Sequence, residues 1–127
     1  MTLLEGKTVL LTGSTGSLGS AIARTLSSAG ARIALTGTNN EKLNNLLMEL
    51  GSSHSAHSCD LSKFEEIDKL SDTVIEEFGS IDILINNAGV KKDDLLIRMK
   101  DDDWFNVINI NLNSVYKLTK NISKHMF

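Results

Sequence analysis

KTVLLTGSTGSLG (residues 7–19) places a strand, a turn and a helix in direct succession. Lys7–Thr12 is an apolar, β-branched run, which is typical of a strand buried on both faces. Gly13–Gly19 is rich in glycine, and from Leu18 to Ala29 apolar residues repeat at helical spacing. The segment therefore predicts the opening of a parallel βαβ unit.

Strands and helices alternate through the rest of the chain. We expect strands at 32–36, 55–59 and 81–85, and helices at 41–50, at 62–78 and from 101 to the last residue. A capping box of Ser62 and Glu65 begins the third helix, and Asp101 or Asp102 caps the last one. The pattern predicts an α/β fold with a Rossmann-type doubly wound parallel sheet, in one domain spanning residues 1–127. Because the last helix has no terminator, we expect the sheet to be truncated after the fourth strand and the following helix.

The composition is that of an ordinary folded domain. Among 127 residues, 41% are hydrophobic and 23% are charged, which argues against disorder. A net charge of −3 argues against nucleic-acid binding. The single cysteine, Cys59, and the lack of a signal peptide or a membrane-spanning apolar run indicate a cytoplasmic protein.

The glycine-rich turn has the features of a phosphate-binding loop. Glycines allow a tight turn and a close approach of the backbone to a pyrophosphate, and the helix N-terminus offers free N–H groups to that anion. An ordinary flexible turn is the alternative. The candidate cofactor-binding residues are Gly13, Ser14, Thr15, Gly16, Ser17, Leu18 and Gly19.

The end of the second strand indicates which dinucleotide would bind. An acidic residue there accepts a hydrogen bond from the ribose 2′-hydroxyl of NAD. Residues 35–40 contain none, so a 2′-phosphate is tolerated, with Thr38 and Asn39 as candidate donors to it. The sequence therefore favours NADP (NADPH), unless these residues simply make a turn.

Several motifs, in order along the whole chain, resemble those of the short-chain dehydrogenase/reductase family. They are TGSTGSLG at 12–19, Cys59-Asp60-Leu61 after the third strand, NNAG at 86–89 and Asn111 within INLNSV. Residues 95–104, LLIRMKDDDW, look like the 3-oxoacyl-[acyl-carrier-protein] reductase branch. The resemblance implies the cofactor half of a Rossmann domain.

The resemblance also implies roles for residues outside the loop. Asp60 would bond the adenine amino group, and Leu61 would flank the ring. Asn111 would be the active-site asparagine that orders a proton-relay water beside the catalytic lysine. The nicotinamide-ribose side would be lined by Asn87, Ala88 and Gly89.

One position departs from the family pattern. Ser17 stands where the family has the middle glycine of its loop, and the glycines here are at 13, 16 and 19. The Cβ of Ser17 would crowd the pyrophosphate unless Gly16 takes the close approach.

Asn111 interrupts an apolar stripe on the last helix. An amide buried there without partners costs about 1–3 kcal/mol, so we expect Asn111 to be buried and bonded to a specific partner, in a catalytic or a structural role. The stripe consists of Trp104, Val107, Ile108, Val115, Leu118 and Ile122.

The family's other catalytic residues are a serine and a Tyr-x-x-x-Lys pair, in which the lysine depresses the pKa of the proton-donating tyrosine. Tyr116 and Lys120 fit that spacing, but they follow Gly89 too closely, and Asp103 stands where the serine would be. We therefore expect the chain alone to reduce nothing, and its last helix to expose an apolar face.

Two further clusters have simple interpretations. His57 and Cys59 share a strand face that His54 does not, and no fourth ligand is evident beside Asp60, so no metal site is expected. A helical face suited either to solvent or to an acidic carrier protein carries Lys117, Lys120 and Lys124.

With the resemblance, the sequence predicts part of an NADP-dependent oxidoreductase of fatty-acid biosynthesis. It would reduce a 3-oxoacyl thioester on acyl carrier protein to the 3-hydroxyacyl form. The family implies a homotetramer, without nucleic-acid or membrane partners. The alternatives are a non-catalytic dinucleotide-binding module and a short-chain reductase of another alcohol or ketone.

Overall fold

The computed structural model describes residues 2–126. Its elements are β1 (Thr8–Leu11), α1 (Ser17–Ser28), β2 (Arg32–Gly37), α2 (Asn40–Leu50), β3 (Ser55–Ser58), α3 (Phe64–Phe78), β4 (Ile83–Ile85), the 3₁₀ turn η1 (Leu96–Arg98), α4 (Asp101–Ile108), the π-helical turn η2 (Asn109–Asn113) and α5 (Ser114–Ser123). Strands and helices alternate as the sequence predicts.

The four strands form one parallel sheet in the order β3-β2-β1-β4. Val9 of β1 lies opposite Ile33 on one side and Ile83 on the other. The chain builds outward from β1 to β3 and then crosses back to place β4 beside β1. This confirms the doubly wound, Rossmann-type fold, and it puts a topological switch point at the carboxyl ends of β1 and β4.

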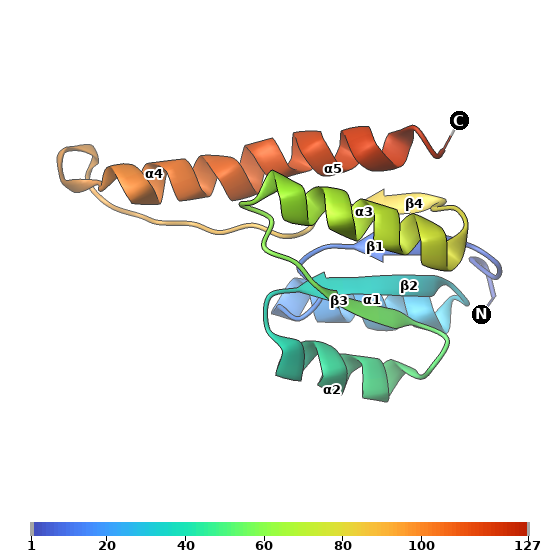
Figure 1. Ribbon diagram of the computed structural model, residues 1–127. Helices are drawn as coiled ribbons and strands as arrows, with labels where there is room; N and C mark the ends of the chain where they lie inside the picture. Colours follow the sequence, from blue (N-terminus) through green and yellow to red (C-terminus); the bar gives the residue numbers. More distant parts are fainter. Residues whose placement is uncertain (1, 127) are drawn as a thin grey trace.

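Helices cover both faces of the sheet (Figure 1). Along β1, Val9 and Leu11 pack toward α1 and α2, whereas Leu10 packs toward α3 and α5, as the two-residue period of a strand requires. All three of these side chains are fully buried. A buried central strand is what the apolar run at 7–12 predicts.

Two helix starts differ from the predicted caps. The capping box of Ser62 and Glu65 is wrong, because α3 begins at Phe64 and the Ser62 hydroxyl donates to Asp60 instead. The Asp101 or Asp102 cap is also wrong. Lys100 is the residue before α4, and the aspartates at 101–103 lie in its first turn, where their charges favour the helix dipole.

The last helix is not a continuous α-helix. The π-helical turn η2 separates α4 from α5, and α5 ends at Ser123. The sequence predicts that this helix continues to Phe127, which lies outside the described residues. Turns of this kind are rare in helices and are frequently found at functional sites.

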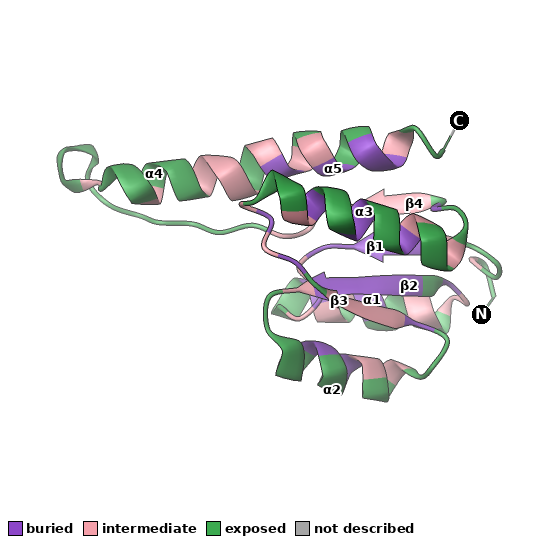
Figure 2. Cartoon of the chain, in the orientation of Figure 1, coloured by how far each residue is buried: buried purple, intermediate pink, exposed green. Residues whose placement is uncertain are grey.

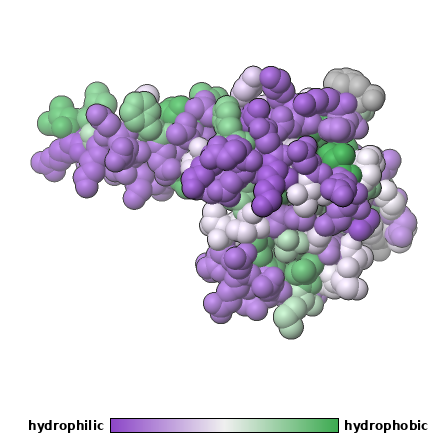
Figure 3. Space-filling model, in the orientation of Figure 1, coloured by the Kyte–Doolittle hydropathy of each residue, from purple (hydrophilic) through white to green (hydrophobic). Residues whose placement is uncertain are grey.

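Residues 90–112, which we term the arm, project beyond the sheet (Figure 1). Leu96 is 80% and Ile97 is 91% exposed, and Trp104 and Phe105 of α4 are exposed as well. Figure 2 shows the arm mostly exposed, and Figure 3 shows apolar side chains gathered at its far end. The expected exposed apolar face is therefore present. Within residues 2–126, no helix combines the length and the apolar character needed to cross a bilayer.

Candidate functional site

A cavity of about 470 Å³ opens at the switch point. Its walls are the segments that follow the carboxyl ends of the strands, together with one residue of η2. Five segments separated in sequence therefore meet at one place. The lining residues are Gly13, Thr15–Gly19, Thr36–Thr38, Cys59–Leu61, Asn87–Val90 and Ile110.

Two glycines allow the loop after β1 to pack closely. Gly13 has φ +63°, and a Cβ there would stand 2.9 Å from the Cα of Ala88. A Cβ on Gly19 would stand 1.8 Å from the carbonyl oxygen of Gly13, whereas one on Gly16 would meet nothing closer than 3.8 Å. Gly13 and Gly19 are therefore sterically required, and Gly16 leaves an open approach.

The N-terminus of α1 faces this cavity. Gly16 precedes the helix, and its carbonyl accepts the N–H of Ser20 at 2.9 Å. Among residues 2–126, the backbone N–H groups of Ser17, Leu18 and Gly19 have no hydrogen-bond partner. Together with the helix dipole, three such donors favour an anion.

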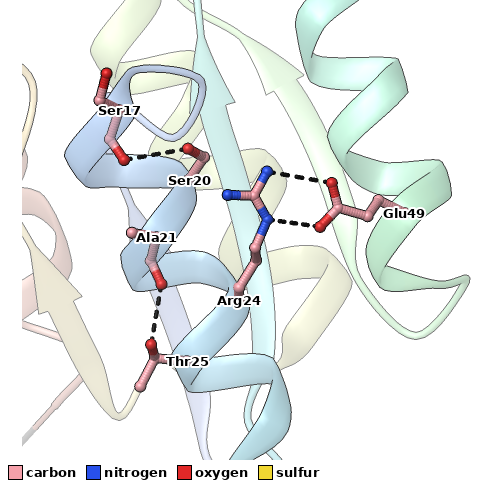
Figure 4. A network of polar contacts seen from close by, with 6 residues as sticks. All are labelled: Ser17, Ser20, Ala21, Arg24, Thr25 and Glu49. Carbon is pink, nitrogen blue, oxygen red and sulfur yellow. Dashed lines mark hydrogen bonds and ion pairs between the residues drawn. The ribbon is translucent and has the colours of Figure 1, made fainter.

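Ser17 sits at the first position of α1. Figure 4 shows its hydroxyl pointing away from the helix, while its carbonyl accepts the hydroxyl of Ser20 at 3.2 Å. The sequence predicts that the Cβ of Ser17 crowds a pyrophosphate unless the anion approaches at Gly16. The space beside Gly16 leaves room for that approach.

Ser14 and Asn39 do not line the cavity. The buried Ser14 hydroxyl donates to the Leu11 carbonyl at 2.8 Å and accepts the N–H of Thr36 at 3.0 Å, so it ties the loop to β2. Asn39 accepts the N–H of Lys42 at 3.0 Å and caps α2. Of the two candidate donors after β2, only Thr38 faces the cavity.

A smaller cavity of about 220 Å³ lies between α1 and α2, and Thr15 lines both cavities. Lys42 and Arg24 also line the smaller one. Arg24 is paired with Glu49, with Nε 2.6 Å from Oε2 (Figure 4), and this pairing raises the pKa of the guanidinium. Lys42 has no ion pair among the described residues. The sequence analysis missed this cation because only the packing of α2 on α1 brings it beside Thr15.

Asp60 is held as an ionised acceptor. The Ser62 hydroxyl donates to its carboxylate at 2.6 Å and the Ser62 N–H donates at 3.0 Å, which lowers the pKa of Asp60. The neighbouring Cys59 behaves differently, because burial raises the pKa of its thiol to about 12 and keeps it protonated.

Asn87 and Ala88 are bonded to the loop after β1. The Thr12 hydroxyl accepts the N–H groups of both residues at 3.0 Å. The Asn87 side chain donates to the Gly13 carbonyl at 3.1 Å. These contacts join the NNAG segment to the glycine loop across the switch point.

Asn111 is exposed, so the expected burial is wrong, because Ile108 and Ile110 beside it are only half-buried and Leu112 is exposed, and no core closes over the amide. The expected specific partner is present. The Asn111 side chain accepts the N–H of Val90 at 2.8 Å and donates to the Val90 carbonyl at 2.6 Å. This pair of bonds ties the π-helical turn to the segment that closes the cavity.

Two lysines of the predicted lysine face on the last helix make different contacts. Lys117 lies 3.3 Å from Asp68 of α3, so it joins two helices. Lys120 donates to the Tyr116 hydroxyl at 3.5 Å, and Tyr116 is not among the residues that line the main cavity.

His54 and His57 have hydrogen-bond partners within the protein. The Nδ1 of His54 accepts the N–H of Ile33 at 3.1 Å, and its other ring nitrogen is 3.0 Å from the Ser27 hydroxyl. His57 contacts the Ser55 hydroxyl at 2.9 Å. In the described part of the chain, no three His, Cys, Asp or Glu side chains gather as a metal ion would require.

Known proteins are similar to this chain in sequence and in fold. Nodulation protein G of a Rhizobium species is 41% identical over 97% of this chain and 50% of its own length, and 3-oxoacyl-[acyl-carrier-protein] reductase FabG of Haemophilus influenzae is 41% identical over 97% and 51%. The crystal structure of a metagenomic short-chain oxidoreductase in complex with NADP superposes with a TM-score of 0.92 at 36% identity, covering 97% of this chain and 57% of that one.

The chain spans about half the length of the curated relatives that it matches. The sequence profile of the short chain dehydrogenases matches residues 7–127. This chain belongs to the short-chain dehydrogenase/reductase family.

Proposed function

We propose that the chain forms the NADP-binding part of a reductase that acts on a 3-oxoacyl thioester carried by acyl carrier protein. The observation that carries the proposal is the row of three unpartnered N–H groups at the N-terminus of α1, facing a cavity at the switch point. The acyl-carrier-protein branch is supported by relatives such as the Haemophilus influenzae reductase.

The residues that line the cavity support an assignment to each part of a dinucleotide. Residues 13 and 15–19 would hold the pyrophosphate through their backbone. Asp60, with its carboxylate ionised and oriented by Ser62, would accept from the adenine amino group, and Leu61 would flank the ring. The nicotinamide ribose would lie along Asn87, Ala88 and Gly89, beside the loop to which they are bonded.

NADP is favoured over NAD by the charges near the adenosine end. Residues 36–39 at the end of β2 carry no carboxylate that would repel a 2′-phosphate. Lys42 lies in the adjoining cavity and is available to a phosphate, because Thr15 connects the two cavities. Thr38 adds a hydroxyl donor on the side of the main cavity.

NADPH supplies a hydride when it is bound. The residues of this chain would bind and orient it, and the Asn111 side chain would hold the Gly89–Val90 segment in place at the nicotinamide end. The family's serine and its catalytic Tyr-x-x-x-Lys pair would lie outside residues 1–127, so this chain would bind the cofactor without reducing a substrate.

Calorimetric titration of the protein with NADPH and with NADH tests the cofactor assignment. We expect NADPH to bind more tightly. Lys42→Ala should raise the Kd for NADPH about tenfold, which is roughly 1.4 kcal/mol, and should leave the Kd for NADH within about twofold. Lys92→Ala is the matched control, because Lys92 is an exposed lysine of the arm. Absence of heat with both coenzymes would contradict the proposal.

The proposal that this chain alone does not reduce a substrate is tested by an activity assay. Oxidation of NADPH is followed at 340 nm with an acetoacetyl thioester and the 127-residue chain. We expect no turnover above the rate without protein. Steady, thioester-dependent oxidation would show that the chain contains a complete catalytic set.

A further inference from the structure

Hydrogen bonds and core packing hold the segment between β3 and α3 that carries Asp60. The Cys59 N–H donates to the Gly37 carbonyl at 3.0 Å, which ties the start of the segment to β2. The Asp60 carbonyl accepts the N–H of Lys63 at 3.1 Å, and the buried Leu61 side chain anchors the segment in the core. These contacts leave one polar group of Asp60 to be satisfied, its own backbone N–H.

Glu66 satisfies that group. Its Oε1 accepts the Asp60 N–H at 2.9 Å, across the loop from the first turn of α3. A carboxylate acceptor makes this bond stronger than a neutral one. Since Asp60 is partly buried, its N–H would otherwise lack a protein partner, which favours a shift of the Asp60 backbone toward water.

This contact is distinct from a helix cap. The residue before α3 is Lys63, whose carbonyl already accepts the N–H groups of Glu66 and Ile67. Glu66 reaches past Lys63 to a residue that lines the main cavity. Glu65 lies in the same turn with the same charge, but its side chain makes no ion pair or hydrogen bond within residues 2–126.

We propose that Glu66 is a positioning residue for the adenine end of the dinucleotide site, which it controls through the backbone of Asp60. Glu66 touches no ligand itself. It fixes where the Asp60 backbone lies, and Ser62 then sets the direction of the carboxylate. This inference rests on the proposed function, because it requires that a dinucleotide with an adenine amino group binds at Asp60.

The test combines protein variants with two ligands. The Kd is measured for NADPH and for its hypoxanthine analogue, in which an oxygen replaces the adenine amino group. The variants are Glu66→Ala, Glu66→Gln, which keeps an acceptor oxygen, and Glu65→Ala, which removes the same first-turn charge. Thermal unfolding of each variant is recorded in parallel.

We expect Glu66→Ala to raise the Kd for NADPH about fivefold to tenfold, and Glu66→Gln to restore it to within about twofold. Glu65→Ala should leave it unchanged. For the hypoxanthine analogue, Glu66→Ala should change the Kd by less than about twofold, because the group that Asp60 recognises is gone. A purely structural role would weaken both ligands equally.

Equal losses for both ligands, or equal effects of Glu65→Ala and Glu66→Ala, would overturn the inference. Should Glu66→Ala not fold, Glu66→Asp keeps the charge but shortens the reach, and it should show the same ligand-selective loss. If the unsubstituted protein binds neither NADPH nor NADH, the proposed function fails, and this inference fails with it. If NADPH binds and the Glu66 variants bind it normally, only this inference fails.

Discussion

The sheet and the arm use similar apolar residues with opposite outcomes. In β1, Leu10 is 0% exposed because α3 and α5 cover it, whereas Leu96 in the arm is 80% exposed. Figure 2 shows β1 and β2 largely buried in the body and α4 mostly exposed in the arm. The same side chain is therefore core in one place and surface in the other.

The difference shows that apolar character alone does not determine burial. The apolar run of β1 lies between neighbours on both edges and both faces, all of which the described chain supplies. The exposed apolar side chains of the arm, among them Leu96, Ile97 and Trp104, have no such cover within residues 2–126. Burial follows from the number of elements that converge on a residue, and that number is highest at the centre of the sheet.

The largest expected effect on stability comes from replacing one leucine with alanine in the sheet, compared with the same substitution in the arm. Leu10→Ala should lower the free energy of unfolding by about 2–5 kcal/mol, because it leaves a cavity in a packed core. Leu96→Ala should change it by less than about 0.5 kcal/mol. Urea unfolding followed by circular dichroism measures both. A loss for Leu96→Ala as large as that for Leu10→Ala would mean that the arm is covered in solution.

A second substitution tests how α5 is attached to the body. The buried Asn121 donates to Asp68 at 2.8 Å and to the Ser71 hydroxyl at 3.2 Å, both on α3. Asn121→Ala should cost about 1–3 kcal/mol, because it removes both hydrogen bonds and leaves the buried Ser71 oxygen without its donor.

Hydrogen exchange should locate that loss in α5 and α3 rather than in β1. Asn44→Ala, at an exposed position of α2, is the control and should be close to neutral. Unchanged protection of α5 in Asn121→Ala would show that apolar packing alone holds that helix.

The smallest expected effect is a pH dependence of the free energy of unfolding, which arises from His54. Burial, with a further contribution from the Arg32 charge, lowers the pKa of His54 below its ordinary value of 6.5. Below that pH the unfolded chain takes up a proton that the folded protein does not. The stability that depends on neutral His54 is therefore fully present above pH 6.5 and is lost as the pH falls toward the lowered pKa.

The pKa of His57 is lowered in the same direction, so the His54 contribution must be isolated. The difference in urea midpoint between the protein and His54→Gln, measured from pH 8 to pH 5, should shrink as the pH falls. A difference that stays constant with pH would mean that His54 remains neutral in the unfolded chain or charged in the folded one.

The alternation of strands and helices, and the segments that line the cavity, could be predicted because their signals are local. The run at 7–12, the glycines at 13 and 19 and the NNAG segment each carry their pattern within a few residues. The features that the sequence predicts wrongly depend on contacts with residues outside the local segment. The sequence predicts a capping box of Ser62 and Glu65, whereas Glu66 makes the contact to the segment before α3. It also predicts a buried Asn111, which no core covers.

The amino-acid sequence alone predicted the alternating elements and a phosphate-binding first turn, and it shows the lack of an acidic group after β2. These properties follow from the spacing of apolar residues and glycines, which is written in the chain itself. Tertiary structure alone determined that Lys42 adjoins Thr15, that Glu66 supports Asp60 and that Asn111 bonds Val90. Each of these pairs joins different elements, so their proximity follows from how helices and strands pack, because packing is set by the whole sheet and not by any one segment.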